Sequence, residues 1–266
     1  VPESGIVRSQ PASSGGTGRL MAVIAIYSVK GGVGKTTLAV DLAWRSATAF
    51  GNRTLIWDLD PQGGAGFLLG RDEPPVERAA AAFQRDNRAR EAVVATAYPG
   101  LSLLPADRSL RQLPLQLPRL GQRRLANMAS YLKLDFDRIF LDCPAGMSEV
   151  TEQAVAAADL LIVPLPASPL SARALDQLRG DLLRRHRRHP PILPVLSMYD
   201  GRRPLHRSVR DGAAANWPVV PLAAQLEMTA VNRAPLGTFT RYTDVGRALK
   251  RLSAGIEARL AQSSAA

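Results

Sequence analysis

The chain has 266 residues, of which 46% are hydrophobic, and a formal net charge of +11 at pH 7. This length is sufficient for a single domain with a buried core. No apolar run reaches the ~18 residues that a membrane-spanning helix requires, and no signal peptide is visible. Cys143 is the only cysteine, which excludes an intramolecular disulfide and favours a reducing compartment, here the cytoplasm.

In chain order, residues 1–19 come first and are rich in Ser, Gly and Pro without periodicity, so we expect a disordered arm or an expression remnant. Apolar runs then alternate with helical patterns, and residues 263–266 form a short tail. The expected strands are 22–28, 54–59, 101–104, 138–142, 160–164, 192–198 and 218–221. The expected helices are 35–49, 77–95, 119–133, 149–158, 171–188, 204–215 and 242–261. This alternation predicts one α/β domain, residues 20–262, with a mostly parallel sheet flanked by helices.

The most informative segment is residues 30–37, with the sequence KGGVGKTT. It follows the first apolar strand and opens the first helix, so backbone N–H groups and a helix N-terminus converge there. This is the setting of a phosphate-binding P-loop, in which Lys35 would bind the β- and γ-phosphates and Thr36 would ligate Mg²⁺. The usual loop has Gly at the position of Val29, and this chain adds a second lysine, Lys30.

Carboxylates follow two further apolar strands. The string RTLIWDLDPQG contains Asp58 and Asp60, and the string DRIFLDCP contains Asp142. Asp58 and Asp60 are two residues apart, so their side chains should point the same way. Because the carboxyl ends of parallel strands share one edge of a sheet, we expect these carboxylates to meet the phosphate loop. Purely structural roles remain the alternative. Asp142 could cap a helix, and Asp-Pro-Gln-Gly is a sequence that favours a turn.

These segments resemble the deviant Walker A loop, the D-x-D-P-Q-G string and the Walker B strand of the ParA/MinD family of ATPases, over about residues 20–260. The resemblance implies a P-loop NTPase fold, ATP and Mg²⁺ as ligands, and weak Mg²⁺-dependent ATP hydrolysis. It implies that Lys30 reaches across a nucleotide-sandwich homodimer and that Asp60 positions the attacking water. The catalytic assignments are Lys30, Lys35 and Asp60, and the metal assignments are Thr36, Asp58 and Asp142. The nucleotide-binding assignments are Gly31, Gly32, Val33, Gly34, Lys35, Thr36, Thr37 and Pro221.

Clustered arginines favour a polyanionic partner. Arg202 follows a Met-Tyr-Asp-Gly string that resembles a region linked to DNA binding in ParA proteins. An ATP-bound dimer would bind double-stranded DNA without sequence preference and associate with the nucleoid. The DNA-binding assignments are Arg184, Arg185, Arg202, Arg203, Arg207, Arg247 and Lys250. The alternative for any single arginine is a solvated charged face.

The predicted function is a partition or positioning ATPase that a ParB-like or cargo adaptor protein releases from DNA by stimulating hydrolysis. The alternative is a MinD-like ATPase that cycles on membranes. Leu249, Leu252, Ile256 and Leu260 are spaced as on an amphipathic helix, although a helix packed on the domain gives the same pattern. A metabolic P-loop ligase shares the fold, but Lys30 and the Asp-Pro-Gln-Gly string argue against it.

Two segments depart from the family pattern. After Val220-Pro221 the family usually has Arg-Asn, whereas this chain has Leu-Ala-Ala-Gln, so the adenine contacts stay unassigned. Residues 71–95, with Arg85, Arg88 and Arg90 among alanines, match nothing in the family. We expect this segment to be either a docking site for a partner or a surface helix.

Overall fold

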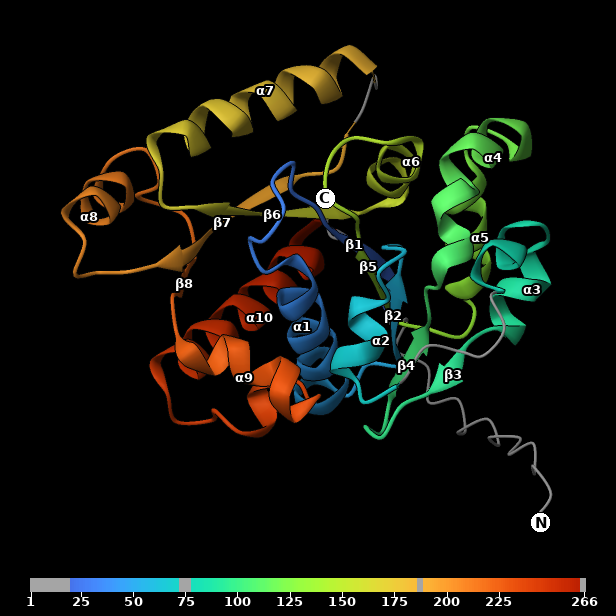
Figure 1. Ribbon diagram of the computed structural model, residues 1–266, viewed down its shortest axis with the longest axis horizontal. Helices are drawn as coiled ribbons and strands as arrows, with labels where there is room; N and C mark the ends of the chain where they lie inside the picture. The colour runs from blue at the N-terminus through green and yellow to red at the C-terminus, as the bar shows by residue number, and fades with distance from the viewer. Residues whose placement is uncertain (1–19, 72–77, 186–188, 264–266) are drawn as a thin grey trace.

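The structure is a computed structural model that describes residues 20–71, 78–185 and 189–263. An eight-stranded sheet runs through it in the order β3-β4-β2-β5-β1-β6-β7-β8 (Figure 1). The strands are β1 (Ala22–Ile26), β2 (Thr54–Asp58), β3 (Val94–Ala95), β4 (Leu101–Leu104), β5 (Arg138–Asp142), β6 (Leu160–Pro166), β7 (Ile192–Tyr199) and β8 (Val219–Pro221). Neighbouring strands pair in parallel except for β3 and β4, so the predicted fold class is confirmed. The expected arm, residues 1–19, lies outside the described residues, as do residues 264–266 of the expected tail.

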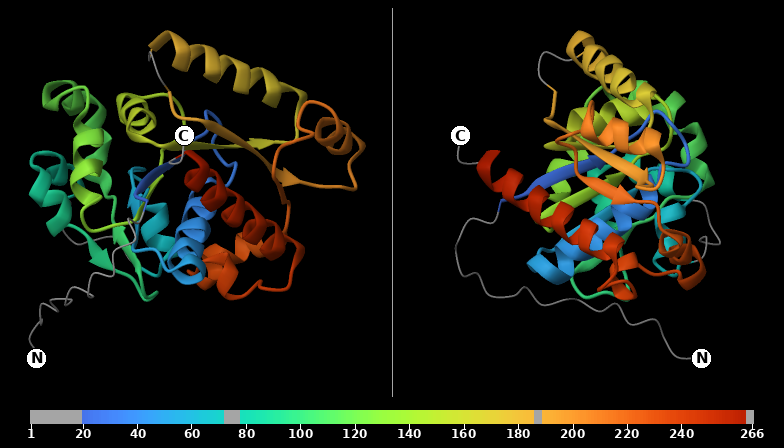
Figure 2. Two further views of the ribbon diagram at one scale, coloured as in Figure 1. Left: turned by 180° about the vertical axis from the view of Figure 1, so that it is seen from behind. Right: turned by 90° about the vertical axis from the view of Figure 1, so that its left-hand side faces the viewer.

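Helices cover both faces of the sheet (Figures 1 and 2). One face packs against α1 (Lys35–Phe50), α2 (Gly64–Leu68), α9 (Ala224–Asn232), the 3₁₀ turn η3 (Leu236–Thr238) and α10 (Asp244–Ser263). The other face packs against η1 (Ala79–Phe83), α3 (Asp86–Glu91), η2 (Arg108–Gln112), α4 (Leu113–Leu120), α5 (Arg124–Leu132), α6 (Glu149–Ala157) and α7 (Pro169–Arg185). Helix α8 (Pro204–Asp211) packs beside β7 at the end of the sheet.

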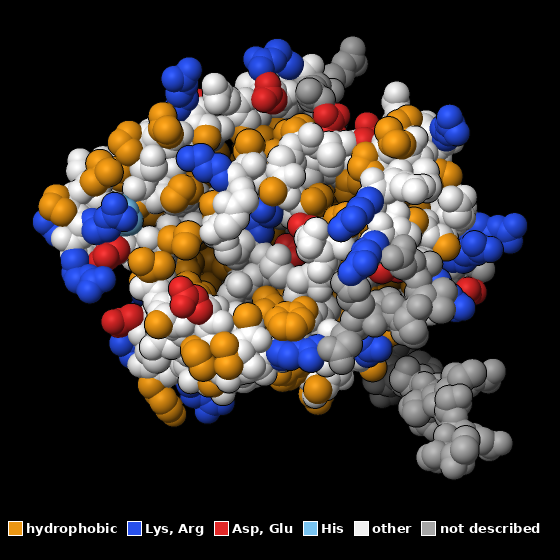
Figure 3. Space-filling model, viewed as in Figure 1, with side chains coloured by type: hydrophobic (Ala, Val, Ile, Leu, Met, Phe, Trp, Pro, Cys, Tyr) orange, Lys and Arg blue, Asp and Glu red, His pale blue; other side chains and the backbone are white. Residues whose placement is uncertain are grey.

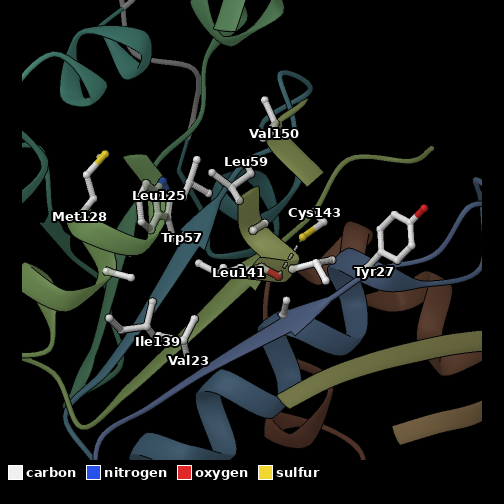
Figure 4. Close-up of a cluster of buried hydrophobic side chains, with 14 of the residues drawn as sticks. Val23, Tyr27, Trp57, Leu59, Leu125, Met128, Ile139, Leu141, Cys143 and Val150 are labelled. Carbon is white, nitrogen blue, oxygen red and sulfur yellow. Dashed lines mark hydrogen bonds between the residues drawn. The ribbon is translucent and has the colours of Figure 1, made fainter. Parts of the chain in front are cut away.

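The central strands are buried on both faces. In β1, Val23 belongs to the core on the α5–α6 side, whereas Ile24 belongs to the core on the α1–α10 side. Figure 4 shows the first of these cores, where Trp57 of β2 lies near Met128 of α5. Alternate residues of a strand point to opposite faces, so a continuous apolar run supplies both cores. This packing fixes the carboxyl ends of β1, β2 and β5.

The C-terminal helix α10 is part of the domain. Its four apolar residues are all buried against the core on the α1 side: Leu249, Leu252, Ile256 and Leu260. Their spacing was expected for a helix packed on the domain. Glu257 of the same helix forms a 2.6 Å ion pair with Arg138 of β5. Among the helices that the structure describes, none has the length and hydropathy needed to cross a bilayer.

The main errors in the predicted elements fall in residues 77–133. The helix expected at 77–95 is instead η1, α3 and the short strand β3, while residue 77 lies outside the described residues. The helix expected at 119–133 is divided at Gly121, whose φ of 113° ends α4 before α5 begins. Helices α2 and α9 were not expected. At residues 78–79 a contact with Asp107 outweighs the local preference for a helix, whereas at Gly121 the backbone conformation of a glycine ends the helix.

Candidate functional site

The loop between β1 and α1 has the backbone of a phosphate-binding loop. Gly32 and Gly34 adopt φ values of 71° and 84°, a left-handed conformation that glycine enters without steric cost. Gly34 is the N-cap of α1 and no side chain caps the helix, so its first N–H groups remain available to an anion. Gly31 and Lys30 are exposed at the mouth of the loop.

Lys35, the first residue of α1, is buried. Its Nζ donates to the backbone oxygen of Lys30 over 3.4 Å, which folds the ammonium back under the loop. Thr36 and Thr37 follow and are half-buried. The loop therefore brings one buried ammonium and one threonine hydroxyl to the helix N-terminus, as the motif predicts.

Asp142 has the surroundings expected of a cation ligand. It ends β5 in register with Ile26 of β1 and Asp58 of β2, so three strand ends converge there. Its carboxylate is fully buried, and neither oxygen receives a hydrogen bond of ordinary geometry from the described residues. Burial, and next the charge of Asp58, raise the pKa of Asp142 well above its usual value, against the opposing effects of Thr36 and Lys35. A buried carboxylate without partners beside Thr36 fits a site for Mg²⁺, a hard cation that prefers oxygen ligands.

Asp58, predicted as a metal ligand, also stabilises the backbone after β2. Its Oδ1 accepts from the Asp60 N–H at 3.0 Å and its Oδ2 accepts from the Ala65 N–H at 2.9 Å. Burial raises the pKa of Asp58 to about 7 in spite of these bonds. Since Oδ1 already holds the turn after β2 and Oδ2 holds the start of α2, Asp58 would contribute to a Mg²⁺ site mainly through its charge and its remaining lone pairs.

Asp60 is half-buried in the turn after β2. Its Oδ1 accepts from the Gln62 N–H at 3.0 Å. This oxygen therefore stabilises the turn that Asp-Pro-Gln-Gly favours. Gly64, at the start of α2, lies against the phosphate loop, because a Cβ built there would be 3.1 Å from Cγ2 of Thr36. The sequence did not reveal this close approach, although two successive glycines after the turn are a signal for it.

A cavity of about 150 Å³ lies beside the loop. It is lined by Gly32, Val33, Gly34, Thr37, Leu38, Ser197, Met198, Val220, Leu222, Ala223, Leu226, Glu227 and Leu249. In Figure 3, apolar side chains line a hollow between the end of β8 and α9. A mostly apolar cavity next to a phosphate loop suits a nucleotide base. Its lining residues are candidates for the base contacts that the sequence left unassigned. Met198 in this lining has a left-handed φ of 55°, which non-glycine residues rarely adopt.

Pro221 is not among the residues that line this cavity. It pairs with Tyr199 in the β7–β8 ladder and lines a neighbouring cleft of about 780 Å³. Its neighbours on either side, Val220 and Leu222, face the base cavity instead. Consecutive residues of a strand point to opposite faces, so Val220 and Leu222 could contact a base in this cavity, while the prediction for Pro221 stays a prediction.

The arginines assigned to DNA fall into two groups. Arg202 and Arg247 line the 780 Å³ cleft together with Arg210 and Arg251. Arg203, Arg207 and Lys250 are exposed on the same elements, α8 and α10. Arg184 lies near the other end of α7, away from this cleft, and pairs with Asp181; the side chain of Arg185 lies outside the described part (Figure 1).

Ion pairs reduce the exposed charge of the cleft. Arg202 binds Asp200 over 2.9 Å, and Arg247 binds Asp244 over 2.6 Å. The hydrogen bonds from Arg202 lower the pKa of Asp200 to about 2, so this pair stays ionised near neutrality. We name the exposed basic residues of α8 and α10, with the four arginines of the cleft, the C-terminal basic patch.

The fold and this site define the chain as a P-loop nucleotide-binding protein. A family model described as an AAA domain (AAA_31) matches residues 21–189. The chromosome partitioning protein ParA of Caulobacter vibrioides (strain NA1000 / CB15N) is 32% identical over 208 residues, which cover 74% of this chain and 77% of that protein. The chain belongs to the ParA/MinD family of partition and positioning ATPases.

Solved structures with the same fold are also similar to this chain. The cell division ATPase MinD of Pyrococcus furiosus matches with a TM-score of 0.73 at 22% identity, over 90% of this chain and 99% of that one, which shows the fold. A structure named cobyrinic acid a,c-diamide synthase from Mycobacterium smegmatis, with a bound ATP analogue and magnesium, has a TM-score of 0.72 at 27% identity. It covers 89% of this chain and 94% of that one.

Proposed function

We propose that this chain is a Mg²⁺-dependent, weakly active ATPase that dimerises around ATP and binds double-stranded DNA without sequence preference in that state. A ParB-like or cargo adaptor protein would stimulate hydrolysis and so return the protein to a monomer that leaves the DNA. This cycle would place the protein in the cytoplasm, on the nucleoid. The cargo is a plasmid, a chromosome region or a protein cluster.

The residues around the loop support the ATP chemistry. Lys35 and the N–H groups from Gly31 to Thr37 would bind the phosphates, while Thr36 and Asp142, with Asp58 behind them, would hold Mg²⁺. Bound Mg²⁺ would neutralise charge that develops on the phosphates. Asp60 would orient the attacking water with the carboxylate oxygen that the Gln62 N–H leaves free of that bond.

The observation that carries the dimer proposal is the surface around the exposed Lys30. Five large apolar side chains are exposed near the carboxyl ends of five neighbouring strands, at the same edge of the sheet: Val29, Met147, Leu170 of α7, Met198 of β7 and Leu222. We call them the apolar rim. Exposed apolar groups that surround a ligand site are typical of a protein–protein interface. A second copy seated on the rim would bring its own Lys30 towards the phosphates, as an arginine finger does.

The membrane alternative is less well supported. The four apolar residues of α10 that would enter a bilayer are buried in the core, and the ion pair between Arg138 and Glu257 holds the helix in place. Exposing them would open the domain. A metabolic ligase remains the second candidate, because one similar structure carries the name of a synthase. Such an enzyme would have no need of the apolar rim or of Lys30.

The test is binding to random-sequence duplex DNA with ADP, ATP and a non-hydrolysable ATP analogue across a salt titration. We expect binding only with ATP or the analogue, with a steep loss of affinity as salt rises. DNA binding that ignores the nucleotide would contradict the proposal. Flotation of the protein with liposomes and ATP tests the membrane alternative in parallel.

A further inference from the structure

A second cleft, of about 870 Å³, lies between the edge strand β8 and α10, which pack side by side (Figure 2). Its floor is apolar and includes Leu193 of β7, Val219 of β8 and Leu252 of α10. It shares Arg210 and Val219 with the 780 Å³ cleft described above, and it extends from there to the end of α10. Neither the nucleotide nor the dimer of the proposed function uses it.

Three guanidinium groups line this cleft, from Arg210 of α8 and from Arg251 and Arg259 of α10. All three side chains are exposed, and within the described residues none of them forms an ion pair. Arg210 lies over the ring of Tyr199, 6.0 Å from its centroid. Among the described residues that line the cleft, none is acidic.

The acidic residues that come nearest along α8 and α10 do not share the cleft. Glu257 pairs with Arg138 of β5, and Asp244 pairs with Arg247. Asp211, at the end of α8, is not part of the lining. The cleft therefore presents three positive charges around an apolar floor, without a carboxylate of its own.

The two arginines of α10 lie on one face of the helix, with Gly255 midway between them. Residues four apart share a helix face, so Arg251, Gly255 and Arg259 form a row about 12 Å long at ~1.5 Å per residue. A Cβ built on Gly255 would meet nothing within 4 Å, so the middle of the row is open space. The row offers two cations on either side of a gap.

We propose that this cleft binds an extended acidic segment of a partner protein, with two carboxylates four residues apart and an apolar side chain midway between them. In an extended chain, side chains two and four residues apart lie on one face, and residues four apart are separated by about 13 Å, close to the length of the arginine row. The carboxylates bind Arg251 and Arg259. The apolar side chain covers Gly255 and contacts the floor, while Arg210 adds a third positive charge from the other wall.

The composition of the cleft favours a peptide over duplex DNA. Protein–DNA interfaces are polar and strongly positive, and an apolar floor adds nothing to the binding of phosphates. Protein–protein interfaces combine an apolar centre with a polar rim and are enriched in arginine. Pro218, which lines the cleft just before β8, has no backbone N–H to offer to an added strand, so side chains supply the recognition.

The three arginines also belong to the C-terminal basic patch. A bound acidic segment would therefore cover part of the surface that we propose for DNA. The peptide proposal itself does not depend on DNA binding, because the cleft, its charges and its floor are present in the protein without nucleotide or DNA.

The probe is a fluorescein-labelled peptide with the sequence Ser-Glu-Ser-Leu-Ser-Glu-Ser. Its binding to the full chain is measured by fluorescence anisotropy at low salt, without nucleotide or DNA. Gly255→Glu places a carboxylate one helical turn from both Arg251 and Arg259 and should weaken binding by about tenfold or more. This variant should fold, since the new side chain enters open space and glutamate is a good helix former.

The matched control is Ala254→Glu, which adds the same charge at the neighbouring exposed position, outside the lining of the cleft. It should bind the peptide within about twofold of the wild type, because the arginine row and its gap are unchanged. Equal loss of binding in the two variants would show that the peptide follows the net charge of the chain, and the proposal would be wrong.

Two changes separate the parts of the recognition. Arg259→Gln removes one exposed ion pair and should weaken binding about threefold to fivefold. A peptide with serine in place of leucine should also bind the wild type more weakly, because it buries less apolar surface on the floor. Full affinity for a peptide with both glutamates changed to glutamine would overturn the proposal.

DNA binding distinguishes this proposal from the proposed function. A wild-type protein that binds the peptide but no DNA would contradict the proposed function and support the peptide site. The reverse outcome is a wild-type protein that binds DNA but not the peptide, with a slope of log K against log salt that falls by about 0.9 in Arg259→Gln. The cleft would then contact phosphates, and the peptide proposal would be overturned.

Discussion

Burial and the charge of Asp58 raise the pKa of Asp142 well above its usual value. Its carboxylate and that of Asp58 lie side by side at two paired strand ends, both fully buried. Because their pKa values are raised in the folded protein, the folded state binds protons that the unfolded chain has already released. The free energy of unfolding should therefore fall as the pH rises from about 4, the ordinary carboxyl pKa, to about 7, the pKa of Asp58.

Asp142→Asn removes one of the two buried carboxylates. At pH 8 and without nucleotide, we expect this variant to be more stable than the wild type by about 1–3 kcal/mol, because an uncompensated buried charge is lost. At pH 4.5 the difference should nearly vanish. Urea unfolding at the two pH values measures it, and a variant that is less stable at pH 8 would refute the assignment. The stabilisation that Mg²⁺ and ATP give the wild type should be lost.

The two lysines of the loop should separate binding from dimerisation. Lys35→Ala removes a buried ammonium from the phosphates and should weaken ATP binding about 10- to 100-fold, as the loss of a charge-assisted hydrogen bond does. Lys30→Ala, at an exposed position, should keep the monomer's ATP affinity and lose the ATP-dependent dimer. Calorimetry and sedimentation measure the two effects. Equal loss of affinity in both variants would remove the proposed role of Lys30.

Asp60→Ala should retain ATP binding while hydrolysis slows by a factor of about 100 or more, within the usual range for a removed general base or water-positioning group. The ATP-bound dimer should then persist on gel filtration. The neighbouring change Gln62→Ala keeps the carboxylate and serves as the matched control. Normal turnover by the Asp60 variant would show that another group orients the water.

At the scale of elements, α10 offers a matched pair of glycines. A Cβ on Gly246 would lie 2.0 Å from the carbonyl oxygen of Thr240, whereas a Cβ on Gly255 meets nothing within 4 Å. Gly246→Ala should therefore destabilise the fold by about 1–3 kcal/mol through overpacking. Gly255→Ala should stabilise it by about 0.5–1 kcal/mol, because alanine is the better helix former. Urea unfolding of both variants tests how firmly α10 is packed; equal effects would contradict it.

The predicted elements were most accurate where one strong pattern acts alone. Continuous apolar runs placed β1, β2 and β5, and the glycine-rich loop placed the start of α1. The segment 77–95 reads as an alanine-rich helix, but Asp107, about 30 residues later, binds the N–H groups of Arg78 and Ala79 and sets a 3₁₀ turn there. A contact of that separation leaves no trace in a local pattern.

The site also has a part that the sequence predicted and a part that it did not. The carboxylates and the loop were predicted to meet because parallel strands share a carboxyl edge, and the register of β1, β2 and β5 brings them together. The base cavity was not predicted, since Ser197 comes from β7 and Leu226 and Glu227 come from α9, two elements whose approach depends on side-chain packing. The departure from the family after Val220-Pro221 was the one signal in the sequence that pointed there.

At the scale of the whole molecule, the apolar rim should control assembly. Leu170→Asp places a charge on the rim and should prevent the ATP-dependent dimer, because burying an unpaired charge at an interface is costly. Nucleotide affinity of the monomer should stay within about twofold. Leu115→Asp, at an exposed position on α4, is the matched control and should dimerise normally. Sedimentation with the non-hydrolysable analogue measures the dimer in each variant. A dimer in both variants would show that the apolar rim is not the dimer interface.

The position of β1 also has a consequence for synthesis of the chain. Of the described strands, the one that carries the phosphate loop is made first, yet its two neighbours are β5 and β6, more than a hundred residues later. At usual rates of translation this apolar strand waits roughly 5–30 s for a partner. A nascent chain is therefore exposed to aggregation through β1. The proposed nucleotide site stays incomplete until β5 supplies Asp142 beside the loop, so the centre of the sheet and this site form together.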